Sequence, residues 1–367
     1  MRIKLRQAFD LQMGKTPARN RPDYWNGDHK WISIADIGNA GKFLTKTKES
    51  ITKAGIDGSG IKVVPQGTVI MSFKLSIGKT AITSEDMYTN EAIMAFIDNG
   101  KFAVDTDYLY HLCCGTNWTA GTNKAVMGLT LNKATLLEKE IPLPDINEQH
   151  EIATKLDKID AIIAERQQQL ELIDQAVKSR FIELFGDPVS NSMGLPTEPM
   201  TTVCAIIDGD RGKNYPKQDE FSDTGYCLFL NAKNVTATGF SFENRMFITK
   251  EKDDALHNGK LERGDVVLTT RGTLGNLAFY DDSVPFENVR INSGMVILRM
   301  KKSVMTEVFF MEQFKLQLQS IKGKIASGSA QPQLPISTMN KIRILLAPMA
   351  LQEQFAAFVE QTDKSKY

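Results

Sequence analysis

The chain of 367 residues has few of the residues that cross-link or anchor a protein. Of its four cysteines, Cys113 and Cys114 are adjacent. Cys204 and Cys227 stand alone, so the spacing fits neither a disulfide framework nor a zinc site. No apolar run reaches the roughly 18 residues that a membrane span needs, and residues 1–9 lack the apolar core of a signal peptide. We therefore expect a cytoplasmic protein with reduced, mostly buried thiols and no membrane partner.

Familiar catalytic motifs are also missing. Gly14-Lys15-Thr16 and Gly78-Lys79-Thr80 resemble the end of a phosphate-binding loop, but neither has the glycine that begins such a loop. The four histidines show no paired metal spacing. Neither a Gly-x-Ser-x-Gly elbow nor the Asn/Asp-Pro-Pro-aromatic motif that holds a flipped base for amino methylation is present. The sequence therefore predicts no catalytic constellation and no metal site.

The charge balance is neutral overall and uneven along the chain. Lysine and arginine number 44, as do aspartate and glutamate. Acidic residues outnumber basic ones within 146–187, whereas the stretches on either side are slightly basic. These small excesses permit a basic face on each globular part without demonstrating one.

The longest uninterrupted helical pattern runs from Asn147 to Phe185 and ends at Gly186-Asp187-Pro188. Apolar residues recur in it at alternating steps of four and three, which is a heptad pattern over roughly four repeats. These seam positions are Ile152, Leu156, Ile159, Ile163, Leu170, Ile173, Val177 and Leu184. A stripe this narrow favours a partner helix, although an ordinary amphipathic helix lying on its own domain is the alternative. We interpret the helix as a spacer about 58 Å long.

A displacement of about 200 residues brings the second half of the chain onto the first, which indicates an internal repeat. Gly67–Lys74 faces Gly264–Arg271, and Gly78 then faces Gly275. Further matched positions are Ser33, Asp36 and Ile37 with Asn231, Asn234 and Val235, Asn90 with Asn292, Gly121-Thr122 with Gly328-Ser329, Pro144 with Pro348, and Glu148-Gln149 with Glu353-Gln354. The matched glycines and aliphatic residues indicate a common core. Lys74 and Arg271 instead suit a shared phosphate contact, with a solvated surface position as the alternative.

The repeat predicts a mixed α/β fold of two globular domains, each followed by a helix. The expected segments are 1–145, 146–187, 188–347 and 348–367. Within the first domain, strand patterns at 63–71, 72–82 and 91–97 precede a short helix at 105–114.

Several segments resemble the specificity (S) subunit of type I restriction-modification systems. Those that carry the resemblance are 13–19, 24–27 and 31–37 in the first domain, 271–275 in the second, and 141–144, 148–149 and 185–188 around the long helix. The resemblance covers almost the whole chain in tandem order.

This resemblance implies a non-catalytic subunit whose two target recognition domains each read one half of a bipartite, asymmetric double-stranded DNA site. The two helices would pair as an antiparallel coiled coil, fix the spacing of the half-sites and dock two copies of the modification (adenine methyltransferase) subunit. A restriction subunit would join the larger complex. S-adenosylmethionine would bind to the partner, so this chain is expected to carry no cofactor.

Residues that contact bases do not follow from the resemblance, so candidates are chosen by their chemistry. Cations suit phosphates and guanine, and side-chain amides suit base edges. The cationic candidates are Lys15, Arg19, Arg21 and Lys74 in the first domain and Arg211, Lys213, Lys217, Lys233 and Arg271 in the second. The amide candidates are Asn231, Asn234, Gln331 and Gln333. Each is alternatively a phosphate contact or plain surface.

The second helix departs from the family pattern, since it begins near Leu351 and the chain stops at Tyr367. We expect this short, apparently truncated helix to leave Leu170, Ile173 and Val177 exposed, which favours self-association in the absence of the methyltransferase. A subunit that still docks its partner through the first helix is the alternative. The rival function is a helical interaction scaffold that does not touch DNA, and a steep salt dependence of DNA binding separates the two.

Overall fold

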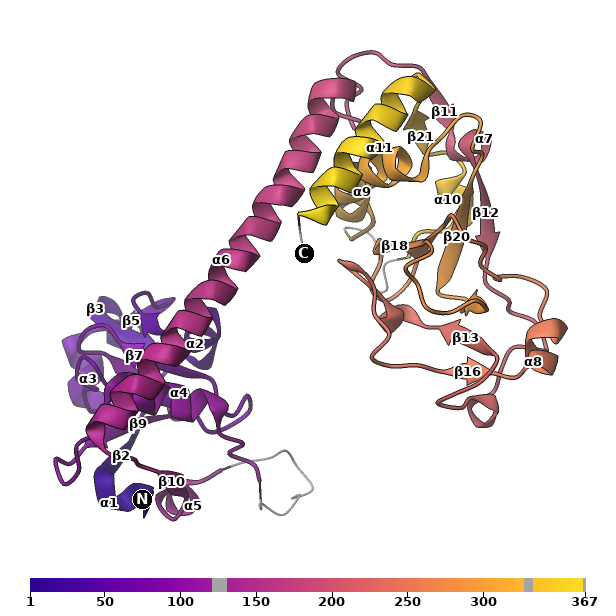
Figure 1. Cartoon of the computed structure of the whole chain (residues 1–367). Helices are drawn as coiled ribbons and strands as arrows, with labels where there is room; N and C mark the ends of the chain where they lie inside the picture. Colours follow the sequence, from indigo (N-terminus) through magenta and orange to yellow (C-terminus); the bar gives the residue numbers. More distant parts are fainter. Residues whose placement is uncertain (121–130, 327–332, 366–367) are drawn as a thin grey trace. The chain divides into compact units, whose positions relative to one another are not determined.

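The computed structural model describes residues 1–120, 131–326 and 333–365 and contains two compact units, Met1–Arg166 and Gln167–Tyr367 (Figure 1). The division falls inside the long helix α6 (Ile146–Phe185), so its first turns belong to unit 1 and its last turns to unit 2. Each unit is mixed α/β, which confirms the predicted fold class.

Unit 1 has a five-stranded sheet in the order β2-β9-β6-β7-β4, a three-stranded sheet β5-β3-β8, and the pair β1-β10. Its strands are β1 (Arg2–Lys4), β2 (Phe9–Met13), β3 (Trp25–Ile32), β4 (Phe43–Leu44), β5 (Glu49–Ile51), β6 (Val69–Ser72), β7 (Thr80–Thr83), β8 (Tyr88–Thr89), β9 (Ile93–Asp98) and β10 (Glu140–Pro142). Its helices before α6 are α1 (Leu5–Ala8), η1 (Pro22–Tyr24), α2 (Ile34–Asn39), α3 (Lys53–Ser59), α4 (Thr106–Gly115) and α5 (Lys133–Leu137).

The central strand β6 has apolar cores on both faces. Val69 and Met71 pack into the core that includes Phe96 and Tyr108, whereas Ile70 packs on the opposite face with Ile32. Alternate residues of a strand point to opposite faces, so a run that is apolar throughout indicates a strand covered on both sides. This covering holds the end of β6, and the loop that follows it, in a fixed place.

Unit 2 has a four-stranded sheet in the order β12-β20-β17-β18, a three-stranded sheet β16-β13-β19, and the pairs β14-β15 and β11-β21. Its strands are β11 (Thr197–Pro199), β12 (Cys204–Asp208), β13 (Cys227–Leu230), β14 (Val235–Thr236), β15 (Gly239–Phe240), β16 (Phe247–Ile248), β17 (Asp265–Thr269), β18 (Leu277–Tyr280), β19 (Val289–Ile291), β20 (Met295–Met300) and β21 (Arg343–Leu345). Its helices are α7 (Met200–Val203), η2 (Gln218–Glu220), η3 (Ala232–Asn234), α8 (Lys250–Ala255), α9 (Glu307–Ala326), α10 (Ile336–Met339) and α11 (Met349–Lys364).

The two units repeat the same connectivity, as the sequence predicts. β2 pairs antiparallel with β9, and β12 pairs antiparallel with β20. The parallel pair β3-β8 has its counterpart in the parallel pair β13-β19. We call α6 the closing helix of unit 1 and α11 the closing helix of unit 2. In both units the first strand pairs with the last strand before the closing helix, as β1-β10 and β11-β21.

A buried glutamine marks the start of the closing helix in each unit and corrects the register of the predicted repeat. The Gln149 side chain accepts a hydrogen bond from the Asp105 backbone N–H at 2.9 Å and donates to the Ala103 and Pro144 carbonyls. The Gln352 side chain makes the same three bonds, to the Thr306 N–H and the Val304 and Ala347 carbonyls. The counterpart of Gln149 is therefore Gln352, and the predicted match with Gln354 was wrong by two positions. A match of two residues in the sequence does not show which glutamine is buried.

An ion-pair cluster fixes the first turns of α6 to unit 1. The Lys42 ammonium lies 2.6 Å from Asp157 of α6 and 2.8 Å from Asp107 of α4, and His111 Nε2 lies 2.8 Å from Asp157. Burial opposes ionisation of Asp157, but its bonds to Lys42 and His111 hold the pKa of this carboxyl below its ordinary value.

The last turns of α6 pack against α11, which runs antiparallel to them (Figure 1). The Phe355 ring of α11 lies 5.5 Å from the Phe181 ring and 5.6 Å from the Phe185 ring, and all three are fully buried. The predicted antiparallel pairing is thus confirmed inside unit 2. The predicted seam omits Phe181 and Phe185, because they lie one position beyond its heptad register.

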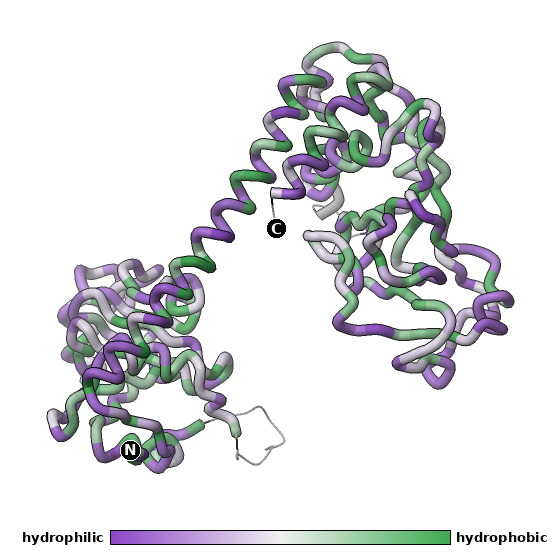
Figure 2. The backbone as a smooth tube through the Cα atoms, in the orientation of Figure 1, coloured by the Kyte–Doolittle hydropathy of each residue, from purple (hydrophilic) through white to green (hydrophobic). Residues whose placement is uncertain are grey.

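The expected exposure at the end of α6 was wrong for Val177, which is buried, and Ile173 is half-buried. The physical reason is direction: an antiparallel second helix begins beside the end of the first, so even a short one covers those turns. The middle of α6 is left exposed instead. The exposed apolar residues there are Leu156, Ile159, Ile162, Ile163, Leu172 and Leu170, the last of which was expected to be exposed. Figure 2 shows apolar and polar stretches alternating along this helix.

The thiols behave as predicted. All four cysteines are free, and Cys113, Cys204 and Cys227 are buried. Burial raises the pKa of Cys204 and of Cys227 to about 12, so both stay protonated near neutral pH. No helix within the described part of the chain combines the length and apolar character that crossing a membrane requires.

Candidate nucleic-acid interface

A loop after the central strand is built in the same way in both units. In unit 1 it follows β6, where the Ser72 hydroxyl donates to the Ser76 carbonyl and accepts from the Lys79 N–H at 3.0 Å. The Gly78 N–H donates to the Ser72 carbonyl at 2.9 Å, and Leu75 at the tip has a φ of 62°. The stretch 72–82 was predicted to be one strand, but Ser72 ends β6, residues 80–82 belong to β7, and this loop lies between them.

The corresponding loop of unit 2 follows β17. The Thr269 hydroxyl donates to the Thr273 carbonyl at 2.5 Å and accepts from the Asn276 N–H at 2.9 Å. The Gly275 N–H donates to the Thr269 carbonyl at 2.8 Å, and Gly272 has a φ of 72°. Each bond matches one in unit 1, so a side-chain hydroxyl at the end of the strand holds both loops in one conformation. We call residues 72–79 and 269–276 the cation loops.

Each cation loop carries a positive side chain at the same position, Lys74 in unit 1 and Arg271 in unit 2. Lys74 is half-buried, with its ammonium 5.2 Å from the Phe73 ring centroid. Arg271 is exposed, and its guanidinium forms no hydrogen bond or ion pair with any residue that the structure describes. Two cations on matching loops, neither paired with a carboxylate among the described residues, are available to an anionic ligand.

In both units, a glycine after the strand β2 or β12 lies in close contact with the backbone of another chain segment. A Cβ at Gly14, after β2, would lie 2.0 Å from the Thr89 carbonyl oxygen. A Cβ at Gly209, after β12, would lie 2.3 Å from the Asn292 carbonyl oxygen. Only glycine fits such approaches. This glycine starts the loop that carries Lys15, Arg19 and Arg21 in unit 1 and the loop that carries Arg211, Lys213 and Lys217 in unit 2.

The cationic candidates of unit 1 other than Lys74 make contacts within the protein. The Arg19 guanidinium lies 3.9 Å from the Trp25 ring centroid and is paired with Glu49, which raises the pKa of Arg19. Arg21 forms two hydrogen bonds to Asp23, at 2.9 and 2.7 Å. The Lys15 ammonium donates to a backbone carbonyl, that of Ser59, at 3.3 Å. Arg19 and Arg21 would have to give up a carboxylate partner to meet a phosphate.

Lys74 belongs to a charged group at the edge of the unit 1 sheet. Glu91 accepts a hydrogen bond from the Thr16 hydroxyl. Burial opposes ionisation of Glu91, but this bond and the nearby charges of Lys74 and Arg19 hold its pKa below the ordinary value. The segments after β2, after β6 and before β9 therefore meet at one edge.

In unit 2, a cavity of about 270 Å³ adjoins the cation loop. Arg211, Arg271 and Gln333 line it together, although they are far apart in sequence. Arg211 is paired with Asp208 at 3.0 Å and donates to the Ser293 carbonyl at 3.3 Å. The fold thus brings together three of the candidates that were selected by chemistry alone.

The other unit 2 candidates fall into three groups. Lys213 and Lys217 are exposed on the loop after β12, and Lys233 is exposed in η3. Asn234 is buried and uses its side chain inside the protein, so it is unavailable to a base. Gln331 lies outside the described residues.

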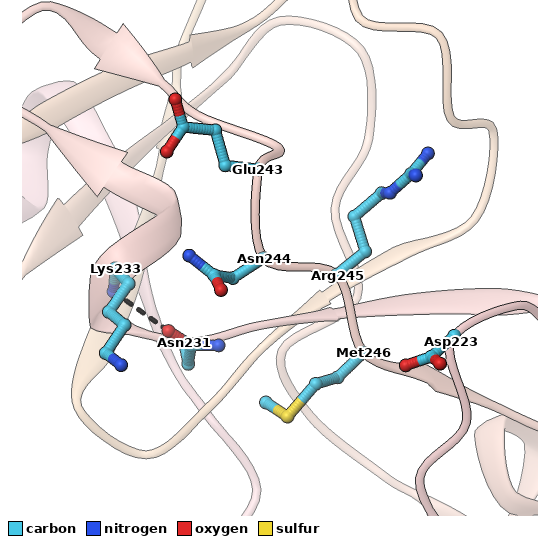
Figure 3. Close-up of a pocket in the computed structure, with 7 residues that line it drawn as sticks. All are labelled: Asp223, Asn231, Lys233, Glu243, Asn244, Arg245 and Met246. Carbon is cyan, nitrogen blue, oxygen red and sulfur yellow. Dashed lines mark hydrogen bonds between the residues drawn. The ribbon is translucent and has the colours of Figure 1, made fainter. Parts of the chain in front are cut away.

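A second cavity in unit 2, of about 480 Å³, collects polar groups that the sequence reasoning largely missed (Figure 3). Two carboxylates, two amides and two cations line it: Asp223, Glu243, Asn231, Asn244, Lys233 and Arg245. Only Asn231 and Lys233 were predicted. The remaining ones are not among the matched positions of the predicted repeat, so the repeat gave no signal for them.

No group of three or more histidine, cysteine, aspartate or glutamate side chains able to hold a metal ion occurs within residues 1–120, 131–326 and 333–365. What the geometry offers is a pair of matched cationic loops, with amide-lined and arginine-lined cavities beside the loop of unit 2. This arrangement suits recognition of a polyanion that carries hydrogen-bonding edges.

Comparison with known proteins agrees with this assessment. The profile of the type I restriction modification DNA specificity domain matches residues 1–173 and 201–366, one copy for each repeat. The chain is similar to the type I restriction enzyme MjaIX specificity subunit of Methanocaldococcus jannaschii, with 24% identity over 387 aligned residues that cover 97% of this chain and 85% of that protein. It is also similar to the EcoprrI specificity subunit of Escherichia coli, with 27% identity over 44% of this chain and 43% of that protein.

A solved structure shares the fold over the full length. The crystal structure of the type I restriction-modification system S subunit from M. genitalium aligns with a TM-score of 0.54 and 16% identity, covering 100% of this chain and 90% of that one. The two matched domains together span most of the sequence. The chain therefore belongs to the family of type I restriction modification DNA specificity domains.

Proposed function

We propose that this chain reads a bipartite, asymmetric double-stranded DNA site for a type I restriction-modification complex, with one target recognition domain for each half-site. The chain is the non-catalytic specificity subunit of such a complex. The observation that carries the proposal is the pair of cation loops, which present Lys74 and Arg271 on the same hydroxyl-held frame.

The matched loops favour a sequence-independent contact. The two halves of an asymmetric site differ in their bases. A cation that both units keep at one position is therefore better suited to the phosphate backbone, which is the same at every site, than to a base. Lys74 and Arg271 would position the duplex, and residues that differ between the units would read it.

The exposed middle of α6 is the proposed docking face for the modification subunit. Ile159, Ile162 and Ile163 are each at least 50% exposed, and a run of apolar side chains on one helix suits helices of a partner. Two copies of the adenine methyltransferase subunit would bind, followed by the restriction subunit in the larger complex. S-adenosylmethionine would be held by the methyltransferase, so this chain would carry no cofactor. Self-association through the same face in the absence of the partner remains part of the proposal.

The test measures DNA binding by the assembled complex against salt concentration. We expect Lys74→Ala and Arg271→Ala each to weaken binding by a similar factor at all sites and to reduce the slope of log affinity against log salt by about 1. Lys101→Ala and Lys341→Ala serve as controls, because both residues are exposed lysines outside the cation loops. Affinity and salt slope that stay unchanged in both loop variants would remove the loops from the interface. Binding without any salt dependence would favour the scaffold function.

A further inference from the structure

The frame shared by the two units extends beyond the cation loops to the segments after β3 and β13, where the two units differ in local structure. In unit 1 the Ser33 N–H donates to Asp36 at 2.8 Å, three residues along the chain. In unit 2 the Asn231 N–H donates to Asn234 at 2.9 Å in the same way. Directly afterwards unit 1 continues as helix α2, whereas unit 2 makes the short hairpin β14-β15 and then the loop 241–246. The loop leads into β16, which pairs with β13 as β5 pairs with β3, so its counterpart in unit 1 is the connection 45–48. The Lys48 N–H there donates to Asp36 at 3.0 Å, whereas Asn234 holds the unit 2 loop through other bonds.

The buried Asn234 fixes that loop in place. Its side-chain amide donates to the Ser241 carbonyl at 3.0 Å and to the Asn244 carbonyl at 2.7 Å. Its backbone carbonyl accepts from the Ser241 N–H at 2.9 Å. Asn234 thus acts as a positioning residue, and the backbone that carries Asn244 is held from inside the protein.

The side chain of Asn244 is available for recognition. It is exposed, and its amide makes no hydrogen bond to any described residue. Figure 3 shows it pointing toward Asn231 and Lys233 across the cavity, while Arg245 extends in another direction. Asn231 uses its side-chain oxygen to accept from the Lys233 N–H at 2.9 Å, which leaves its side-chain nitrogen to donate. Asn244 therefore presents both a donor and an acceptor, beside further donors.

The cavity adjoins the cation loop, so a duplex held there lies within reach. The Thr273 hydroxyl donates to the Ala232 carbonyl at 3.4 Å, and the Asn276 amide donates to the Val235 carbonyl at 2.9 Å. Ala232 stands between Asn231 and Lys233 in the chain. The carboxylates of Asp223 and Glu243 at the cavity make it a poor phosphate site but can accept from the amino groups of bases.

We propose that Asn244 is a specificity-determining residue that reads an adenine in the half-site of unit 2, with Lys233 beside it as a further donor. The inference rests on the proposed function. A carboxamide matches the acceptor N7 and the donor N6 amino group that adenine displays in the major groove. The predicted consequence is confined to one base pair of one half-site.

The experiment expresses the chain with its cognate modification subunit in a methylation-free host and sequences the methylome. With Asn244→Ala, we expect one adenine position in one half of the motif to become degenerate, while the other half and the gap stay unchanged. On duplexes, discrimination at that position should fall by about tenfold or more. Gln319→Ala, which removes an exposed amide from α9, should leave the motif as it is. An unchanged motif with Asn244→Ala would overturn the inference and leave the proposed function standing.

A complete loss of methylation by the alanine variant is resolved with Asn244→Asp, which keeps the side-chain shape and removes the donor. Its complex is compared with the unaltered one on duplexes in which each base pair of the half-site is replaced in turn. Lost discrimination at a single adenine supports the inference, and discrimination retained at every position overturns it. If the unaltered chain itself yields no two-part motif, the proposed function fails and this inference fails with it.

Discussion

Removal of the Phe355 side chain should destabilise unit 2 while leaving the stability of unit 1 unchanged. Phe355 is fully buried, and its ring contacts Phe181 and Phe185, which in turn lie 5.5 and 4.6 Å from the Phe309 ring. Large-to-small changes at buried phenylalanines cost about 3–5 kcal/mol. Because the ring joins two helices and the surrounding rings cannot all collapse into the space, we expect Phe355→Ala to lower the free energy of unfolding of unit 2 by about 4 kcal/mol.

Urea denaturation can separate the two units in the full chain. All three tryptophans, Trp25, Trp31 and Trp118, belong to unit 1, so tryptophan fluorescence follows that unit while far-ultraviolet circular dichroism follows both. With a slope of about 2 kcal/mol per molar urea, the unit 2 transition should fall by about 2 M. The fluorescence transition should stay in place.

The matched control is Ile163→Ala on α6, which removes an apolar side chain that is 60% exposed. Surface changes of this kind usually stay within about 0.5 kcal/mol. A Phe355→Ala shift no larger than that of Ile163→Ala would refute the pairing of α6 with α11. A fluorescence transition that moves together with the dichroism transition would refute the division into units.

Two further predictions concern buried polar groups. Gln352→Ala should destabilise unit 2 by roughly 2–3 kcal/mol in the same urea assay, because it leaves the Thr306 N–H and two carbonyls without partners. The control Gln361→Ala, on the exposed side of α11, should have little effect. Burial opposes ionisation of Asp253, yet its bonds to Lys260 and Arg290 hold its pKa below the ordinary value. A lowered folded-state pKa gives stability that is complete above the unfolded pKa of about 4 and is lost as pH falls through the lowered value. Asp253→Asn should therefore be less stable at neutral pH and lose part of the acid dependence of unit 2 unfolding, and an unchanged acid profile would contradict the role of this carboxyl.

The sequence predicted the tandem fold because duplication leaves a strong signal in glycines and strand cores. Lys74 and Arg271 were found by their equal spacing from the matched glycines, although that spacing does not reveal the hydroxyl-held loops that carry them. The register of the closing helices was less accessible, since the choice between Gln352 and Gln354 depends on which one is buried. The heptad pattern likewise selected Val177 and Leu184 and omitted Phe181 and Phe185, which pack against α11. A heptad pattern in one helix does not show where the partner helix lies.

The recognition cavity of unit 2 was largely beyond sequence reasoning. Asn231 and Asn234 looked alike as amides next to a strand, and only the fold separates the cavity residue from the buried one that holds the loop. Asn244 and Arg245 carried no signal, since they are not among the matched positions of the predicted repeat. For the same reason, a comparison of the two halves of the sequence cannot identify residues that differ between the two units.

The central claim is that this chain gives a type I complex its two-part DNA specificity. The most direct measurement is the methylome of a methylation-free host that expresses the cognate modification subunit with and without this chain. The account predicts a gapped adenine motif that appears only when the chain is present. Methylation that does not depend on the chain, or no new motif although the two proteins are soluble and purify together, would contradict it.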